Sequence, residues 1–326
     1  MNYKSVIGHS KNIELLKKIL ETDRMPHALL FSGPWGIGKR LAAVSLAAAI
    51  NCESRSEHGA CGTCSSCTKL KAGNHPMVKF VGSPTEERLE TDFIDGRSAI
   101  IGNIIAVDDA DTVKKTIKIN IYQVRQIIRE ASLKSFGFGK KIFIIDDVSE
   151  ASTEALNCLL KVLEEPPEDT FLILITSKEE WLLPTIKSRC QRVGFSALDK
   201  EDMRRVIDIK VSEEVQEKQK EELIEISSGS PGRFFRFLEI ENIVLSGIHP
   251  EDFFKEAAKW SSESSQCSEK LQVLLELEGI KFRRSPTREG QSRIEIIEDT
   301  LINVKKNANT DLSVSNMFLK LGALKI

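Results

Sequence analysis

A glycine-rich segment near the N-terminus, GPWGIGKR (residues 33–40), has the residue types and spacing of a loop that binds phosphate. The backbone N–H groups of such a loop, with the start of the following helix, form a concave anion site, and Lys39 would neutralise the β- and γ-phosphates. Arg40 stands where a Ser or Thr would normally coordinate magnesium. A chance glycine turn before a helix is the simpler alternative. The candidate nucleotide-binding residues in this segment are Gly33, Gly36, Gly38, Lys39 and Arg40.

Two adjacent carboxylates, Asp146 and Asp147, follow the apolar run KKIFII. In ATPases with a phosphate-binding loop, the first acid of such a pair coordinates magnesium and the second orients the attacking water. Asp147 is one methylene shorter than the glutamate usual at the second position, so we expect its carboxylate to reach the attacking water poorly. Alternatively, the pair ends a strand and caps the next helix.

Four of the seven cysteines form the pattern Cys52-x8-Cys61-x2-Cys64-x2-Cys67. Because the sequence lacks a secretion signal, this clustering favours a metal site over a disulfide framework. Four converging thiolates suit tetrahedral zinc in a closed structural site over residues 52–67. The alternatives are thiols without a metal and an iron–sulfur cluster, although the bacterial ferredoxin pattern would require a further cysteine where Lys71 stands.

A lone arginine in the segment SRC, Arg189, has two interpretations. It precedes a predicted strand and follows a helical segment, so its charge could stabilise the C-terminal end of that helix. Alternatively, it could reach the nucleotide of a neighbouring subunit, where a guanidinium stabilises charge on the transferring phosphoryl group.

Composition places the chain among ordinary soluble globular proteins: 326 residues with 41% hydrophobic and 29% charged residues. The formal net charge of −2 gives no overall positive excess that would point to nucleic acid. No stretch approaches the roughly 18 apolar residues that span a bilayer, and the N-terminal segment lacks the apolar run of a signal peptide. We therefore expect a cytoplasmic protein with no membrane partner.

Apolar runs typical of buried strands alternate with segments of helical periodicity in the first part of the chain. This alternation predicts an α/β core with a parallel sheet covered by helices. Residues 82–116 look loop-like. Beyond Ser196 the pattern is helical throughout. We expect an α/β core at residues 1–195, a small helical lid at 196–245 and an all-helical domain at 246–326.

Several short segments of the chain resemble segments of the bacterial DNA polymerase III clamp loader, an AAA+ assembly. They extend from residue 7 to residue 233 and occur in the order found in that family. They are IGH (7–9), MPHALLFSGPWGIGK (25–39), the four-cysteine segment, GNHP (73–76), ALNCLLKVLEEPPEDTFLILIT (155–176), LLPTIKSRCQ (182–191) and GSPGR (229–233). A weaker match, NANTDLSVSNMFLKL (307–321), resembles the last helix of the oligomerising collar domain.

The resemblance implies roles for individual residues. Thr176 would be the polar sensor at a strand end, Arg233 a lid arginine that touches phosphate, and Arg189 an arginine finger offered in trans. It also implies a structural Zn²⁺, and partner subunits of the gamma/tau and delta types in a hetero-pentamer. Through that complex the chain would act on the sliding clamp and primed DNA.

Within this family, Arg40 and Asp147 favour a delta-prime-type subunit with little or no ATPase activity of its own. Lys39 and Arg233 need no magnesium to attract phosphate, so ATP binding can survive where ATP–Mg²⁺ hydrolysis does not. The alternatives are an active gamma/tau-type ATPase, a stand-alone AAA+ ATPase, and a zinc-bearing scaffold without nucleotide.

Overall fold

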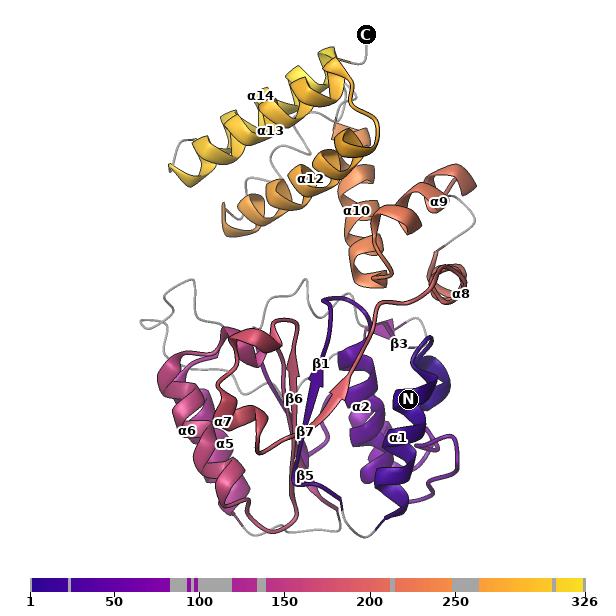
Figure 1. Ribbon diagram of the computed structural model, residues 1–326, viewed down its shortest axis with the longest axis vertical. Coiled ribbons are helices and arrows are strands. Elements are labelled where there is room, and N and C mark those ends of the chain that lie inside the picture. The colour runs from indigo at the N-terminus through magenta and orange to yellow at the C-terminus, as the bar shows by residue number, and fades with distance from the viewer. Residues whose placement is uncertain are drawn as a thin grey trace. The chain divides into compact units, whose positions relative to one another are not determined.

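The chain divides into two compact units: residues 1–211 with 229–232, and residues 212–228 with 233–326. A computed structural model describes the protein (Figure 1). The described residues are 2–22, 25–82, 93–94, 97–98, 119–133, 139–211, 215–247, 264–306 and 309–324.

A parallel five-stranded sheet, with strand order β2-β5-β6-β1-β7, forms the centre of the first unit. The predicted parallel sheet is therefore confirmed. In Figure 1, α5, α6 and α7 cover one face of the sheet, and α1 and α2 cover the other. The strands are β1 (Ala28–Ser32), β2 (Val78–Val81), β5 (Lys141–Ile145), β6 (Thr170–Thr176) and β7 (Gln191–Gly194). The helices on its faces are α1 (Ser10–Glu21), α2 (Lys39–Ile50), α5 (Ile121–Ser132), α6 (Thr153–Glu164) and α7 (Pro184–Lys187).

The central strands are apolar along their whole length because both faces of the sheet are covered. Every residue of β1, β5 and β6 is buried. Alternate side chains such as Leu30, Phe143 and Leu172 pack against α5 and α6 in one apolar cluster. The helices begin where the sequence supplies caps: the Ser152 hydroxyl accepts a hydrogen bond from the Ala155 N–H at 3.1 Å and so starts α6.

The strand order determines which loops share one edge of the sheet. In β1, β5 and β6 the chain runs in the same direction, so their carboxyl ends lie at the same edge. The glycine loop follows β1, the Asp146–Asp147 pair follows β5, and Thr176 ends β6. Segments that are separated by more than a hundred residues in the sequence are therefore brought together at one site.

Shorter elements complete the first unit. They are η1 (Tyr3–Ser5), α3 (Ser65–Lys71), η2 (Val148–Glu150), η3 (Glu179–Trp181) and α8 (Lys200–Lys210). Most of the 82–116 segment lies outside the described residues. Within its described part, β3 (Phe93–Ile94) and β4 (Arg97–Ser98) pair as a short antiparallel ladder.

The second unit is helical, as the sequence pattern beyond residue 196 predicts. It contains α9 (Glu217–Ile226), α10 (Pro231–Gly247), α12 (Ser264–Arg284), α13 (Arg288–Lys305) and α14 (Thr310–Ala323). The first two residues of α10 cluster with the first unit. Buried side chains such as Phe237, Leu274 and Phe318 form the core of the second unit. No helix among the described residues combines the length and apolar character that crossing a bilayer requires. The exact boundaries 1–195, 196–245 and 246–326 stay a prediction.

We expect Phe143→Ala to lower the free energy of unfolding by about 3–5 kcal/mol, because it removes a buried ring and leaves a cavity between β5 and the helices on its face. Urea unfolding followed by circular dichroism measures this. Ile209→Ala is the matched control: Ile209 on α8 is 75% exposed, so its loss should change stability by no more than about 0.5 kcal/mol. Equal effects of the two substitutions would contradict the assignment of the core.

Candidate functional site

The three glycines of the loop adopt backbone conformations that favour glycine. Gly33, Gly36 and Gly38 have positive φ angles of 146°, 75° and 96°, a region that side chains with a Cβ rarely adopt. The loop leads directly into α2, whose first residue is Lys39. Its ammonium group donates to the Gly33 carbonyl at 2.7 Å and to the Pro34 carbonyl at 2.5 Å. Lys39 therefore lies inside the loop, at the position predicted for a phosphate-binding lysine.

Burial lowers the pKa of Lys39 to about 8, while the nearby carboxylates of Asp146 and Asp147 raise it. Only 6% of Lys39 is exposed. A pKa of about 8 leaves the ammonium largely charged at neutral pH. The positive charge that would attract phosphate is thus retained.

Arg40 forms an ion pair with Asp146, across the edge of the sheet. Its Nε donates to Asp146 Oδ2 at 3.0 Å, and Nη2 contacts the same oxygen. The two side chains are only 17% and 16% exposed, so water screens this pair weakly. Asp146 is the carboxylate expected to coordinate magnesium. In this chain one oxygen of that carboxylate is paired with a guanidinium.

Asp147, the second acid, is buried and belongs to a hydrogen-bonded chain. Ser149 Oγ donates to Asp147 Oδ1 at 2.9 Å, and Thr176 Oγ1 donates to Ser149 Oγ at 3.1 Å. The Thr176 oxygen also accepts from the Lys178 N–H at 3.0 Å. The structure therefore connects the predicted acid and the predicted sensor through Ser149, a residue that sequence reasoning missed. No spacing in the sequence identifies that serine, because the connection joins β5 to β6.

Asp147 has φ 58° and ψ 52°, in the left-handed region. Aspartate is several-fold enriched there among residues other than glycine, and such backbone conformations concentrate at functional sites. The conformation places the carboxylate next to Ser149 rather than at the end of an extended strand. The alternative expectation is met in part: the pair directly follows β5, and Asp147 stands at the N-cap position of η2, but its side chain makes no capping hydrogen bond to that helix.

Two segments that carry the family resemblance, IGH (7–9) and GSPGR (229–233), position the glycine loop. From IGH, the buried His9 ring donates from Nε2 to the Ile37 carbonyl at 2.7 Å. From GSPGR, Ser230 Oγ donates to the Trp35 carbonyl at 2.8 Å, and the Gly232 N–H donates to the Gly36 carbonyl at 2.8 Å. These contacts from two distant segments fix the carbonyl side of the loop.

Gly232 is required at this contact by its close approach to the loop. A Cβ on Gly232 would lie 2.7 Å from the Cα of Gly36, well inside van der Waals contact.

Burial lowers the pKa of His9, which favours the neutral ring. In the sequence, these two segments carry only the family resemblance, apart from the role that it implies for Arg233.

Arg189 lies just after α7 and makes contacts with its own chain. Nη2 pairs with Glu164 Oε1 at 2.8 Å, and Nη1 donates to the Thr185 carbonyl at 3.0 Å. The second contact satisfies a carbonyl of α7, as the simpler interpretation of this arginine expects. The side chain is 34% exposed, so part of the guanidinium remains accessible.

Arg233 belongs to the second unit. There it pairs with Glu276 of α12, and its guanidinium carbon lies 5.5 Å from the centroid of the Phe237 ring. Its predicted contact with phosphate stays a prediction.

The four cysteines converge on one point, as the spacing predicts. Their sulfur atoms all lie within 4.8 Å of one another. Cys52 Sγ and Cys64 Sγ are 3.9 Å apart, and Cys61 Sγ and Cys67 Sγ are 4.0 Å apart. A tetrahedral metal with metal–sulfur bonds of about 2.3 Å would place its sulfurs about 3.8 Å apart. The cluster can therefore hold a metal ion, and the sulfur separations are far longer than the roughly 2.05 Å of a disulfide.

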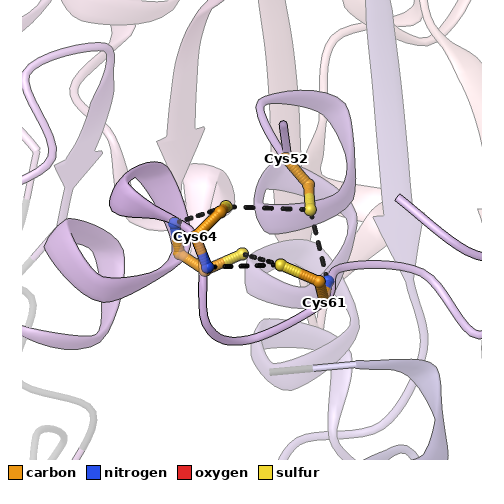
Figure 2. A group of neighbouring side chains, drawn as sticks. Cys52, Cys61 and Cys64 are labelled. Carbon is orange, nitrogen blue, oxygen red and sulfur yellow. Dashed lines mark hydrogen bonds between the residues drawn. The ribbon is translucent and has the colours of Figure 1, made fainter. Parts of the chain in front are cut away.

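Figure 2 shows Cys52, after the end of α2, with Cys61 in the following loop and Cys64 at the start of α3. Backbone N–H groups point at the sulfurs: Cys64 N donates to Cys61 Sγ at 3.3 Å, and Cys61 N donates to Cys52 Sγ at 3.2 Å. Hydrogen bonds from the Thr63 and Cys64 backbones lower the pKa of Cys61 to about 6. Such donors favour the thiolate, the form that binds metals.

Residues outside the cluster hold it against the sheet. His75, from the word GNHP, is buried and accepts at Nδ1 from the Met77 N–H at 3.2 Å. Its Nε2 therefore carries the proton and donates to Ser66 Oγ, 2.9 Å away on α3. The Asn51 amide pairs with both the N–H and the carbonyl of Lys140, at 2.8 and 3.0 Å, next to β5. The metal-ligand loop is thus tied to the same sheet that positions the glycine loop.

A protein-family model described as DNA polymerase III, delta subunit, matches residues 8–199. The subunit delta' of DNA polymerase III from Pseudomonas aeruginosa is 34% identical over 209 residues, which cover 63% of this chain and 53% of that protein. Subunit delta' of Bacillus subtilis is 34% identical over 188 residues, 57% of this chain and 47% of that protein. The matched part of the chain thus spans about half the length of these two relatives.

DNA polymerase III subunit tau of Bacillus subtilis is 30% identical over 196 residues, 60% of this chain and 29% of that protein. Among solved structures, a gamma subunit-related protein from Thermotoga maritima superposes with a TM-score of 0.51 at 17% identity, over 97% of this chain and 100% of that one. At this identity the match concerns the fold alone. With the parallel sheet, it confirms the α/β AAA+ fold that the resemblance implies.

We expect one metal ion per chain in protein purified without added metal, because the four thiolates already have tetrahedral separations. Cys64→Ser should lose the ion and loosen α3, while the sheet persists on its own core. Elemental analysis measures the metal, and circular dichroism measures the fold. Cys158→Ser, at a cysteine of α6 outside the cluster, is the control and should keep the ion. Metal-free protein under reducing conditions would contradict the site.

Proposed function

Because the chain belongs to the DNA polymerase III delta subunit family, we propose that it is a delta-prime-type subunit of the clamp loader. In this role it helps to place the sliding clamp on primed DNA. Its partners are gamma/tau-type and delta-type subunits in a hetero-pentamer. The matches to delta' proteins of two bacteria support this proposal.

The Arg40–Asp146 ion pair is the observation that favours delta-prime over a motor subunit. For Mg²⁺ to bind at Asp146, the guanidinium must leave a carboxylate that is mostly shielded from water. The local charge is balanced without a metal, since two cations, Lys39 and Arg40, face two carboxylates, Asp146 and Asp147. Hydrolysis depends on the metal that bridges the phosphates and neutralises their developing charge. We infer that the site has lost hydrolysis.

An active gamma/tau-type ATPase is the second candidate. The match to the tau subunit favours it, and so does Lys39, which keeps its position inside the loop. The two candidates differ in one measurable property: a motor subunit hydrolyses ATP with magnesium, whereas this chain should not.

The metal at the four cysteines is, we infer, zinc. Four thiolates in a closed tetrahedral arrangement form a structural site, with no open position for chemistry. Iron found by the elemental analysis would favour the cluster alternative instead.

We expect negligible Mg²⁺-dependent ATP turnover in the isolated chain. We also expect Arg40→Thr to increase Mg²⁺-dependent nucleotide binding, since it frees Asp146 and restores a hydroxyl ligand. Titration of a fluorescent ATP analogue with and without Mg²⁺ measures binding, and phosphate release measures turnover. Arg40→Lys keeps the cation and is the control. Turnover by the wild type at rates typical of AAA+ enzymes would reject the delta-prime assignment.

In the assembled clamp loader, Arg189→Ala should reduce turnover at the one ATP site that faces this chain. An arginine finger supplied in trans accelerates turnover by roughly 10³–10⁵-fold in GTPases. Other sites continue, so total ATPase falls only in part, while clamp loading falls further because it needs the sites to act together. Arg205→Ala, at an exposed arginine of α8, is the control. Unchanged rates in a complete complex would leave Arg189 with only its local role.

A further inference from the structure

Both terminal nitrogens of Arg189 are occupied by acceptors of its own chain. Nη2 is 2.8 Å from Glu164 Oε1, and Nη1 is 3.0 Å from the Thr185 carbonyl. Nη1 also lies 3.5 Å from Ser188 Oγ. A guanidinium that binds a phosphoryl group uses the same N–H groups, usually as a pair of parallel hydrogen bonds. To offer both terminal nitrogens to a neighbouring phosphoryl group, Arg189 must give up these contacts.

Glu164 stands at a position where its charge is locally unfavourable. It is the last residue of α6, and the partial negative charge of a helix C-terminus repels a carboxylate. The residue after it leads into Pro166 and Pro167, which fix the end of the helix. Arg189 compensates for this repulsion. The carboxylate is thus presented to Arg189 by a rigid element rather than by a loop.

The pair is weak enough to exchange. Glu164 and Arg189 side chains are 49% and 34% exposed, so water and salt screen their attraction. A triphosphate carries several negative charges on oxygens that match the guanidinium fork. Such a ligand in a water-poor interface is the stronger partner. A single half-exposed carboxylate is the weaker one.

We propose that Glu164 is the resting partner of Arg189: it holds the guanidinium away from the neighbouring site and releases it when that site contains nucleotide. This inference rests on the proposed trans role of Arg189. Glu164 is a positioning residue, since it acts on the neighbour's reaction only through Arg189. Glu164 is the first glutamate of the segment LEEPP (163–167).

The test uses the reconstituted complex with four versions of this chain: wild type, Glu164→Gln, Arg189→Ala and the double variant. Glutamine keeps the shape of the side chain but removes its charge. The finger-dependent rate is the wild-type ATPase rate minus the Arg189→Ala rate. We expect Glu164→Gln to raise the kcat of the finger-dependent ATPase by about 1.5- to 5-fold, which is the fold-change that corresponds to losing a surface ion pair. The KM for ATP should not change. The double variant should match Arg189→Ala.

Glu165→Gln is the matched control, because it removes the adjacent exposed glutamate and the same unit of charge. It should leave the rate unchanged. An unchanged or lower finger-dependent rate in Glu164→Gln would overturn the proposal, as would an equal rise in Glu165→Gln or in the Arg189→Ala background. If Arg189→Ala itself has no effect in a complete complex, the proposed trans role fails first. The two failures are therefore distinguishable.

Discussion

The constraint on which the rest of this structure depends is a parallel sheet buried on both faces. Its central strands contain only buried residues, and their common direction brings the ends of β1, β5 and β6 to one edge. The strand order therefore determines which loops lie next to one another at that edge. The glycine loop, the paired aspartates and Thr176 thus meet at one place because apolar packing fixes the strands, rather than because these polar groups attract one another.

Within that framework, charge balance determines what the site can do. A nucleotide site that uses magnesium leaves its carboxylate open for a divalent cation. Here the guanidinium of Arg40 is already paired with Asp146, and Lys39 bonds to carbonyls of its own loop. The positive charges of Lys39 and Arg40 are thus balanced by the carboxylates of Asp146 and Asp147 within the protein. We infer that such self-pairing keeps the shape of the glycine loop and weakens its attraction for a metal.

The cysteine cluster and the glycine loop are mechanically connected through one helix. α2 begins at Lys39 and ends just before Cys52, so the loop lies at one end of it and the first metal ligand at the other. Asn51 ties the second end to the chain beside β5, and His75 supports α3, the helix that contains Cys67. A metal ion at the cysteines would therefore stabilise the helix that begins at Lys39.

The sequence alone determined the parts of this protein that depend on local residue types. Alternating apolar runs identified the parallel sheet, since strands buried on both faces must be apolar throughout. Glycines at fixed spacing identified the loop, and the cysteine spacing identified the cluster, because both depend on short-range backbone geometry. The words shared with clamp-loader subunits identified the family.

Tertiary structure alone decided which side chains act on one another. Arg40 was recognised as an anomaly, but its pairing with Asp146 joins residues 106 positions apart. For the same reason, the sequence does not show that Ser149 lies between Asp147 and Thr176, or that Glu164 lies beside Arg189. Local pattern fixes the elements because backbone preferences act over a few residues. Partner choice among polar groups is decided by which strand and helix ends the fold brings together.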